Sequence, residues 1–299
     1  MRHNDIRLGR RAVLGALLAV PALVACGTSQ GAPPPAPASP GPDLAELERR
    51  HDARLGLYAI NVRTGRTLVN RPDERFALCS TFKTYAVAAL LRDHGASSDY
   101  FDKIIRYTRD DLVSYSPVTE QHVDTGMTVR ALCEATMTVS DNTAANLLLR
   151  ERGGPASIAP FARSIGDPTT RLDRWEAELG TAIPGDERDT STPAGLATGY
   201  RALVVGDALA APEREQLTAW LVANTTGDKA LRAGLPPTWR TGEKTGSGEY
   251  GTRNDVGATW TEDGTPIVIA ALSSRPRQDD EGRDELIADA ARVVAAHLR

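Results

Sequence analysis

A serine and a lysine three residues apart, in the segment Ser80-Thr81-Phe82-Lys83, have the types and spacing that nucleophilic catalysis needs. Apolar residues precede this segment, and residues 84–91 continue a helical pattern, so Ser80 is predicted at the N-terminus of a helix. Free backbone N–H groups and the positive end of the helix dipole favour developing negative charge at such a position. A serine hydroxyl needs a base nearby, and Lys83 is predicted on the same helix face, within reach of it.

Two further segments carry polar side chains that complement this pair. Ser140-Asp141-Asn142 precedes a short helical pattern, where Asp141 alone could act as an N-cap. Lys244-Thr245-Gly246 ends a predicted strand, whose edge offers backbone N–H and C=O groups to an extended ligand. A lone Ser-x-x-Lys is expected by chance about once in a chain of this size, and Lys244 alone could be a surface residue. The joint occurrence of all three segments, in this order, indicates one site.

The three segments in this order are the signature of class A β-lactamases and penicillin-binding proteins. The chain resembles a class A serine β-lactamase over nearly all of residues 43–299, and Arg174-Trp175-Glu176-Ala177-Glu178-Leu179 resembles the ω-loop motif of that family. The resemblance implies an α/β fold (an α+β sandwich) of the β-lactamase/transpeptidase kind. That fold has an antiparallel sheet flanked by helices and an inserted all-helical lobe.

The resemblance also implies a role for each matching residue. Ser80 attacks the lactam carbonyl and becomes acylated, with either Lys83, or Glu176 through a water, as the base. Ser140 passes a proton to the departing nitrogen, and Glu176 activates the water that hydrolyses the ester. The implied substrate-binding residues are Asn142, Lys244, Thr245, Gly246, Ser247, Arg253 and Tyr115. The implied supporting residues are Asn146, Arg174 and Asp189, the last two closing the ω loop by an ion pair.

Two positions depart from the family pattern near the deacylating glutamate. Gly180 stands where many members have an asparagine that helps to hold the deacylating water, which predicts slower deacylation of some substrates. Ala177 replaces a common proline, and the peptide bond before it could be cis or trans. A third segment, Lys229-Ala230, lacks an alternative carboxylate-binding arginine, which leaves that role to Arg253.

Two other functions fit part of the pattern. A D-Ala-D-Ala peptidase or penicillin-binding protein shares the three segments but releases the drug-derived ester slowly. A non-hydrolysing β-lactam-binding lipoprotein would need only the acylated serine, and Glu176 in its motif disfavours both alternatives. A formal net charge of −4 without a dense basic run disfavours nucleic-acid binding, and five scattered histidines indicate no metal site. No cofactor is expected.

The order of predicted elements shows how these residues are positioned. The expected helices cover 43–52 and 283–298, and the expected strands cover 57–62, 66–70, 240–245, 255–261 and 267–273. The stretch to about residue 223 is mainly helical. Both chain ends therefore share one sheet-and-helix lobe, about 43–75 and 224–299, and a helical lobe, about 76–223, is inserted between them. A cleft between two such lobes is a natural small-molecule site.

The N-terminal residues precede the catalytic domain. Arg10-Arg11 before an apolar run predicts a signal peptide of the twin-arginine or lipoprotein type at 1–25, and Cys26 is the expected lipidation site. The proline-rich segment 26–42 is a predicted linker. The protein is therefore expected outside the cytoplasm as a monomer, anchored to the cell membrane through Cys26 or, alternatively, secreted or periplasmic. Cys79 and Cys133 are predicted to be buried free thiols.

Overall fold

The computed structural model describes residues 42–299. The predicted signal peptide, Cys26 and all of the linker except Pro42 lie outside the described residues. The catalytic domain predicted at 43–299 lies within them.

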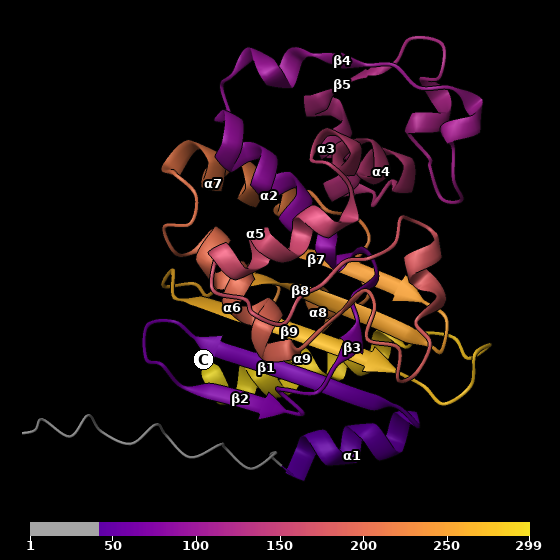
Figure 1. Ribbon diagram of the computed structural model, residues 1–299. Helices are drawn as coiled ribbons and strands as arrows, with labels where there is room; N and C mark the ends of the chain where they lie inside the picture. Colours follow the sequence, from indigo (N-terminus) through magenta and orange to yellow (C-terminus); the bar gives the residue numbers. More distant parts are fainter. Residues whose placement is uncertain (1–41) are drawn as a thin grey trace, which may run out of the picture. The chain divides into compact units, whose positions relative to one another are not determined.

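A five-stranded antiparallel sheet of order β2–β1–β9–β8–β7 forms the centre of one layer (Figure 1). Its strands are β1 (Arg54–Asn61), β2 (Thr67–Asn70), β7 (Arg240–Gly248), β8 (Thr252–Trp260) and β9 (Pro266–Ser274). Most residues of the central strands are buried on both faces. This burial explains why β9 is a continuous apolar run from Ile267 to Leu272 instead of a strict alternation of apolar and polar residues.

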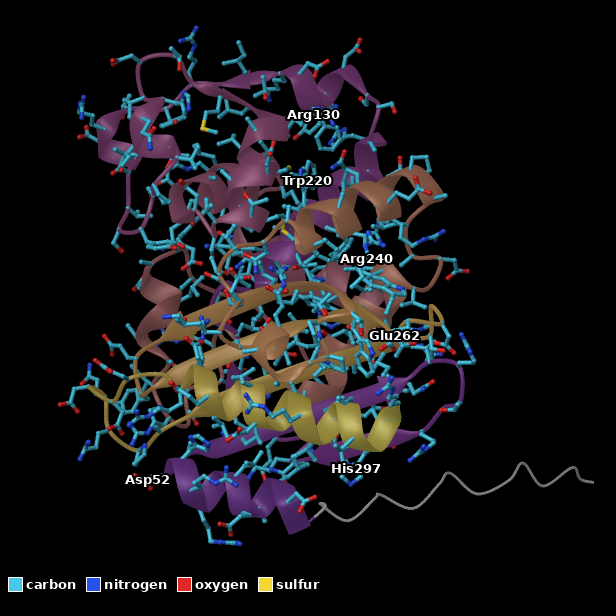
Figure 2. All side chains as sticks on the ribbon, turned by 180° about the vertical axis from the view of Figure 1, so that it is seen from behind. Asp52, Arg130, Trp220, Arg240, Glu262 and His297 are labelled. Atoms are coloured by element: carbon cyan, nitrogen blue, oxygen red, sulfur yellow. The ribbon has the colours of Figure 1, made fainter. Side chains whose placement is uncertain are left out.

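Helices from the two chain ends cover one face of this sheet, as the view from behind shows (Figure 2). They are α1 (Pro42–His51), α8 (Leu231–Gly234) and α9 (Asp284–Leu298). Leu44 and Leu47 of α1 and Leu286 and Val294 of α9 are buried in one apolar cluster with the sheet. At the end of α9, Leu298 is buried in this cluster and His297 is exposed.

The opposite face of the sheet carries α6 (Pro193–Val204), beyond which the helical lobe is built around α2 (Lys83–His94). The first nine residues of α2 are buried, because other helices surround it. Those helices are α3 (Val129–Thr138), α4 (Asn142–Glu151), α5 (Ile158–Ser164) and α7 (Ala211–Val222). Short 3-10 turns join these elements: η1 (Cys79–Phe82), η2 (Asp99–Asp102), η3 (Arg109–Asp111), η4 (Thr119–Gln121), η5 (Pro155–Ser157) and η6 (Glu178–Thr181).

The lobe predicted as all-helical also contains two short antiparallel ladders. One pairs β3 (Phe76–Ala77) with β6 (Thr190–Ser191), and the other pairs β4 (Ile104–Ile105) with β5 (Met127–Thr128). Two-residue strands carry too little periodicity to be predicted from sequence. The β3–β6 ladder bears on the site, because β3 leads directly into the segment with Ser80.

Cys79 and Cys133 are free and buried, as the sequence predicts. Within residues 42–299, no helix has the length and apolar character that crossing a membrane requires.

Candidate active site

Ser80 lies in the 3-10 turn η1, one turn before α2 begins at Lys83. The chain therefore enters α2 through a tighter turn than the predicted helix start. Strand β7 approaches this turn closely at Gly246: a Cβ there would lie 2.8 Å from Leu78 O and 3.2 Å from Ser80 N. Only a glycine allows the Lys244-Thr245-Gly246 edge to sit this near the serine backbone.

Glu176 and Lys83 converge on the Ser80 hydroxyl. Ser80 Oγ donates to Glu176 Oε1 at 2.8 Å, and Lys83 Nζ lies 3.0 Å from the same oxygen. Lys83 Nζ also donates to Ser140 O at 2.8 Å and to Asn142 Oδ1 at 2.6 Å. The predicted direct contact between Lys83 and Ser80 is replaced by this link through Glu176. Complete burial lowers the pKa of Lys83, because an uncompensated ammonium is costly in the interior.

Ser140 holds its hydroxyl between two buried lysines. Lys83 Nζ lies 3.2 Å from Ser140 Oγ, and Lys244 Nζ lies 3.0 Å from it. Ser140 has a positive φ of 61°, in the left-handed region that non-glycine residues seldom adopt. Both amines donate to this oxygen, so the serine's own proton is free to point elsewhere. The Ser140 hydroxyl is therefore within hydrogen-bond distance of both amines.

The backbone of Glu176 is clamped by one side chain of α4. Asn146 Nδ2 donates to Glu176 O at 2.7 Å, and Glu176 N donates to Asn146 Oδ1 at 3.0 Å. Glu176 itself is buried. The peptide bond between Glu176 and Ala177 is cis, which answers the question that the sequence left open.

The ω loop, residues 173–189, is closed by Arg174 and Asp189. Arg174 Nε donates to Asp189 Oδ2 at 2.5 Å, and Asp189 Oδ1 accepts from the backbone N–H groups of Asp173 and Arg174 at 2.7 and 2.9 Å. Asp189 is fully buried, so this closure is shielded from solvent. Leu78 N donates to Asp189 O at 2.8 Å, which joins the loop to the segment that carries Ser80.

The β7 edge and Arg253 of β8 form the opposite wall. Arg253 Nη1 donates to Ser247 Oγ at 3.0 Å, and Nε donates to Asp284 Oδ1 at 2.5 Å. Thr245 Oγ1 lies 2.5 Å from Thr226 Oγ1. Sequence reasoning missed Asp284 and Thr226, because an acid in the first turn of a helix and a loop threonine have ordinary structural explanations.

Tyr115 is exposed, whereas Asn142 is buried against Lys83. Tyr115 is 60 % exposed and has a positive φ of 61°. Asn142 Nδ2 donates to Ser114 O at 2.9 Å, and its oxygen accepts from Lys83. Asp141 caps α4 by accepting from Ala144 N at 2.8 Å, as its position in the sequence suggested.

Two buried carboxylic acids beneath Lys244 were not predicted. Glu243 accepts from Asn224 Nδ2 at 2.6 Å and lies 2.8 Å from Arg232 Nη2, and Asp255 accepts from Leu231 N at 3.1 Å. Burial raises the pKa of Glu243 to about 9 and that of Asp255 to about 7, and the charge of Asp255 adds to the shift of Glu243. Nothing in their sequence pattern distinguishes these acids from surface ones.

Known proteins match this chain over most of its length. Residues 41–298 match the model of the β-lactamase enzyme family. The chain belongs to that family. It is similar to β-lactamase AST-1 of Nocardia asteroides, at 54% identity over 98% of this chain and 97% of the relative. It is similar to β-lactamase FAR-1 of Nocardia farcinica, at 56% identity over 86% of this chain and 82% of the relative.

Solved β-lactamases have the same fold. The enzyme from Streptomyces albus G superposes with a TM-score of 0.83 at 50% identity, covering 86% of this chain and 98% of that one. The enzyme from Desulfarculus baarsii superposes with a TM-score of 0.84 at 48% identity, covering 86% and 96%. The protein is thus a class A serine β-lactamase, which hydrolyses β-lactam antibiotics and confers resistance to them, as predicted.

The structure of this β-lactamase has room for a larger side chain at Gly180. A Cβ at Gly180 meets no other heavy atom within 4 Å, so Gly180→Asn has room for its amide. One added hydrogen bond to the attacking water is worth about 0.5–1.5 kcal/mol, or about two- to tenfold faster deacylation of slow substrates. Single-turnover kinetics measures this, with Gly180→Ala as the control that adds no amide. Equal rates in the two variants would contradict the prediction.

Proposed function

We propose that Ser80, Lys83, Ser140 and Glu176 are the catalytic residues of this β-lactamase. One observation carries the proposal: the Glu176 Oε1 atom is shared by the Ser80 hydroxyl at 2.8 Å and the Lys83 amine at 3.0 Å. A carboxylate that already accepts the serine proton is placed to act as the base for acylation. This geometry favours Glu176 over Lys83 as the direct acceptor.

The acylation step then runs from Ser80 to Ser140. Ser80 Oγ gives its proton to Glu176 and attacks the lactam carbonyl, whose oxygen accepts from the backbone N–H groups of Ser80 and Ser247. The carbon–nitrogen bond of the ring breaks as Ser140 gives its proton to the nitrogen. Lys83 or Lys244, both within 3.2 Å of Ser140 Oγ, replaces that proton.

Before deacylation, Glu176 passes the proton that it took from Ser80 to Lys83, 3.0 Å from Glu176 Oε1, which replaces the proton that the lysines gave to Ser140. The restored carboxylate then acts a second time. Glu176 takes a proton from water, the hydroxide formed attacks the ester carbonyl, and the bond to Ser80 Oγ breaks as that oxygen regains a proton. Asn146 serves this step by holding the Glu176 backbone through two hydrogen bonds. Arg174 and Asp189 serve it by closing the loop that carries Glu176.

Intact-mass spectrometry after mixing with benzylpenicillin tests the proposal. The wild type is expected to return to its unmodified mass within seconds while penicilloate accumulates, and Ser80→Ala is expected to show no adduct. A lasting adduct on the wild type would indicate a penicillin-sensitive peptidase or a non-hydrolysing β-lactam-binding protein. Turnover that survives in Ser80→Ala would overturn the assignment of the nucleophile.

We propose that Lys244, Thr245, Gly246, Ser247 and Arg253 bind the substrate carboxylate along β7, with Asn142 and Tyr115 contacting the rest of the molecule. Arg253 supports this assignment, because Asp284 and Thr226 hold its guanidinium beside Ser247. Guanidinium groups pair well with carboxylates in a forked geometry.

The pH dependence of substrate capture is expected to follow Lys244. Burial, reinforced by the charge of Lys83, lowers the pKa of Lys244 to about 7. The side chain is therefore an ammonium below this pH and an uncharged amine above it, and only the ammonium attracts a carboxylate. Above pH 7, kcat/KM for benzylpenicillin is expected to fall by up to about tenfold per pH unit. Lys244→Arg, which keeps its charge, should lose this alkaline decline. An unchanged decline in Lys244→Arg would assign it to another group.

We further propose that the enzyme acts outside the cytoplasm as a monomer, held to the membrane by a lipid on Cys26. The apolar run before Cys26 and the paired arginines at 10 and 11 support export. In cells, the wild type should be recovered in the membrane fraction and Cys26→Ser in the soluble fraction. Sedimentation of residues 42–299 at the mass of one chain tests the oligomeric state, and a dimer mass would overturn it.

A further inference from the structure

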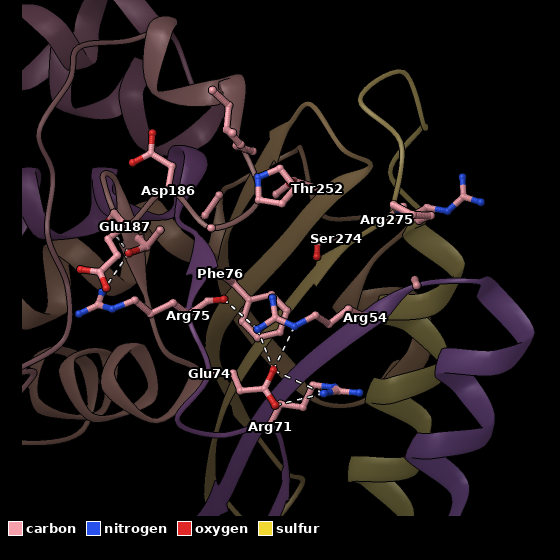
Figure 3. Close-up of a pocket in the computed structure, with 18 of the residues that line it drawn as sticks. Arg54, Arg71, Glu74, Arg75, Phe76, Asp186, Glu187, Thr252, Ser274 and Arg275 are labelled. Atoms are coloured by element: carbon pink, nitrogen blue, oxygen red, sulfur yellow. Dashed lines mark hydrogen bonds and ion pairs between the residues drawn. The ribbon is translucent and has the colours of Figure 1, made fainter.

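A cavity of about 920 Å³ opens beside β3 and the end of the ω loop. Its walls come from the end of α1, the start of β1, the segment 71–77, residues 182–190 and the end of β9 (Figure 3). Among the described residues that line it, none belongs to the catalytic or substrate-binding set. Its volume is typical of pockets that enclose small molecules.

The charged lining of this cavity has a small excess of arginine. Six arginines and five carboxylic acids line it, whereas acids outnumber basic residues in the whole chain. Five of these arginines are within 4 Å of a carboxylate. The six arginines are Arg49, Arg54, Arg71, Arg75, Arg188 and Arg275. Arg75 is the one without a carboxylate partner within residues 42–299, and its guanidinium donates to Thr169 O and Thr190 Oγ1 instead.

One arginine offers a fixed planar cation. The guanidinium of Arg54 lies over the ring of buried Phe76, 3.8 Å from its centroid. Glu74 holds it by two hydrogen bonds of 2.8 and 3.1 Å, and Arg71 fixes Glu74 in turn, as Figure 3 shows. Arg54 uses Nε and Nη2 in these bonds, so Nη1 has no hydrogen-bond partner within residues 42–299. Guanidinium planes stack on aromatic rings and donate to carboxylates or sulfonates.

The lining also contains apolar side chains. They are Ile183, which is 47% exposed, Pro184 and Pro276. A cationic plane together with an apolar rim matches a ligand with a flat apolar body and an acidic group. Neutral sugars and cations lack one or both of these features.

The cavity also touches the connection between Ser80 and Glu176. Phe76 and Ala77 pair with Ser191 and Thr190 in the β3–β6 ladder, and Leu78 N donates to Asp189 O at 2.8 Å. Arg75 Nη1 donates to Thr190 Oγ1 at 2.9 Å from the cavity side. A molecule bound in the cavity would contact the β3–β6 ladder. This ladder joins the segment that carries Ser80 to the end of the ω loop.

We propose that this cavity is a second ligand site for an aromatic organic anion, and that its occupancy alters turnover at Ser80. The ring stacks on Arg54 and contacts Ile183, and the acidic group pairs with Arg75. The effect on turnover passes through the β3–β6 ladder to Asp189 and the ω loop. The inference goes beyond the hydrolysis mechanism and does not depend on the roles proposed for Lys83 or Glu176.

The probe that tests this site is 1-anilinonaphthalene-8-sulfonate, an aromatic sulfonate whose fluorescence rises on binding. Ile183→Asp places a carboxylate at the cavity rim and is expected to weaken binding about tenfold or more by charge repulsion. Ile104→Asp is the matched control, since Ile104 is 53% exposed on β4 and does not line the cavity. In the wild type, saturating probe is expected to change kcat for benzylpenicillin, and Ile183→Asp is expected to remove this effect.

Three results would overturn the inference. Equal probe affinity in the wild type and Ile183→Asp, or an equal loss in Ile104→Asp, would exclude the cavity as the binding site. A probe that raises only the KM for benzylpenicillin would be a competitor in the catalytic site. The third result concerns the coupling to turnover. If Ile183→Asp abolished binding but saturating probe left the kcat of the wild type unchanged, the site would exist without that coupling, and this part of the inference would be overturned.

Discussion

Glu176→Ala is expected to acylate and then remain acylated. The substitution removes the buried carboxylate that contacts Ser80 Oγ at 2.8 Å, so no base remains to activate water against the ester. Loss of a positioned general base typically costs about 10²–10⁴-fold, and kcat for benzylpenicillin should fall by that factor. Acylation should continue more slowly, because Lys83 has a lowered pKa and can supply some uncharged amine. Intact-mass spectrometry should therefore show a persistent penicilloyl adduct.

The neighbouring glutamate provides a matched control for this experiment. Glu178 lies two residues further along the same loop and is exposed. Glu178→Ala should keep a kcat within about twofold of the wild type, because an exposed loop charge contributes little. An adduct that clears from Glu176→Ala at the rate of the wild type would show that another group activates the water.

Lys83→Met is expected to slow acylation, the step that forms the adduct, whereas Glu176→Ala mainly slows deacylation. The amine holds Glu176 Oε1, Asn142 Oδ1 and Ser140 O at once, so methionine of similar volume removes three contacts while keeping the packing. The variant also loses one of the two proton donors to Ser140. Acylation should slow by about 10²–10⁴-fold. Rapid-quench mass spectrometry measures the rate at which the adduct appears.

The exposed lysine at position 229 is the control for this substitution. Lys229→Met changes the same functional group on the surface and should leave the acylation rate unchanged. If Lys83→Met formed the adduct as fast as the wild type and then retained it, Lys83 would be needed only for deacylation. That outcome would contradict the assigned relay through Ser140. Thermal unfolding of both variants separates a catalytic loss from a loss of folded protein.

Much of the fold is predictable because its elements have strong local signals. The three C-terminal strands each lie within three residues of their predicted positions, and β9 is an apolar run from Ile267 to Leu272. Two ends differ most: β8 begins at Thr252 instead of residue 255, and β7 continues to Gly248 instead of ending at Thr245. Glycine has a low strand propensity, so Gly246 and Gly248 disfavour a strand locally. They are nevertheless part of β7, because they pair with Asn254 and Thr252 of β8. Tertiary pairing overrides propensity here.

The residue types of the site are also readable from sequence, but their contacts are not. Ser80 and Glu176 are 96 positions apart, and only the folded ω loop decides that the carboxylate comes between the serine and Lys83. The buried acids Glu243 and Asp255 illustrate the same limit. Their significance arises from burial beneath Lys244, which depends on the whole sheet and its covering helices.

The two free thiols have a practical consequence. Cys79 precedes the nucleophile and Cys133 lies within α3, and burial raises the pKa of both thiols well above the ordinary range. Because the thiolate is the reactive form, alkylating reagents are expected to react very slowly with either thiol while the protein is folded. The labelling rate of each thiol therefore measures how often the structure around it unfolds locally. Cys79 reports on the turn that carries Ser80, and Cys133 reports on the helical lobe. Comparing their labelling rates would distinguish local breathing around the nucleophile from cooperative unfolding of the entire molecule.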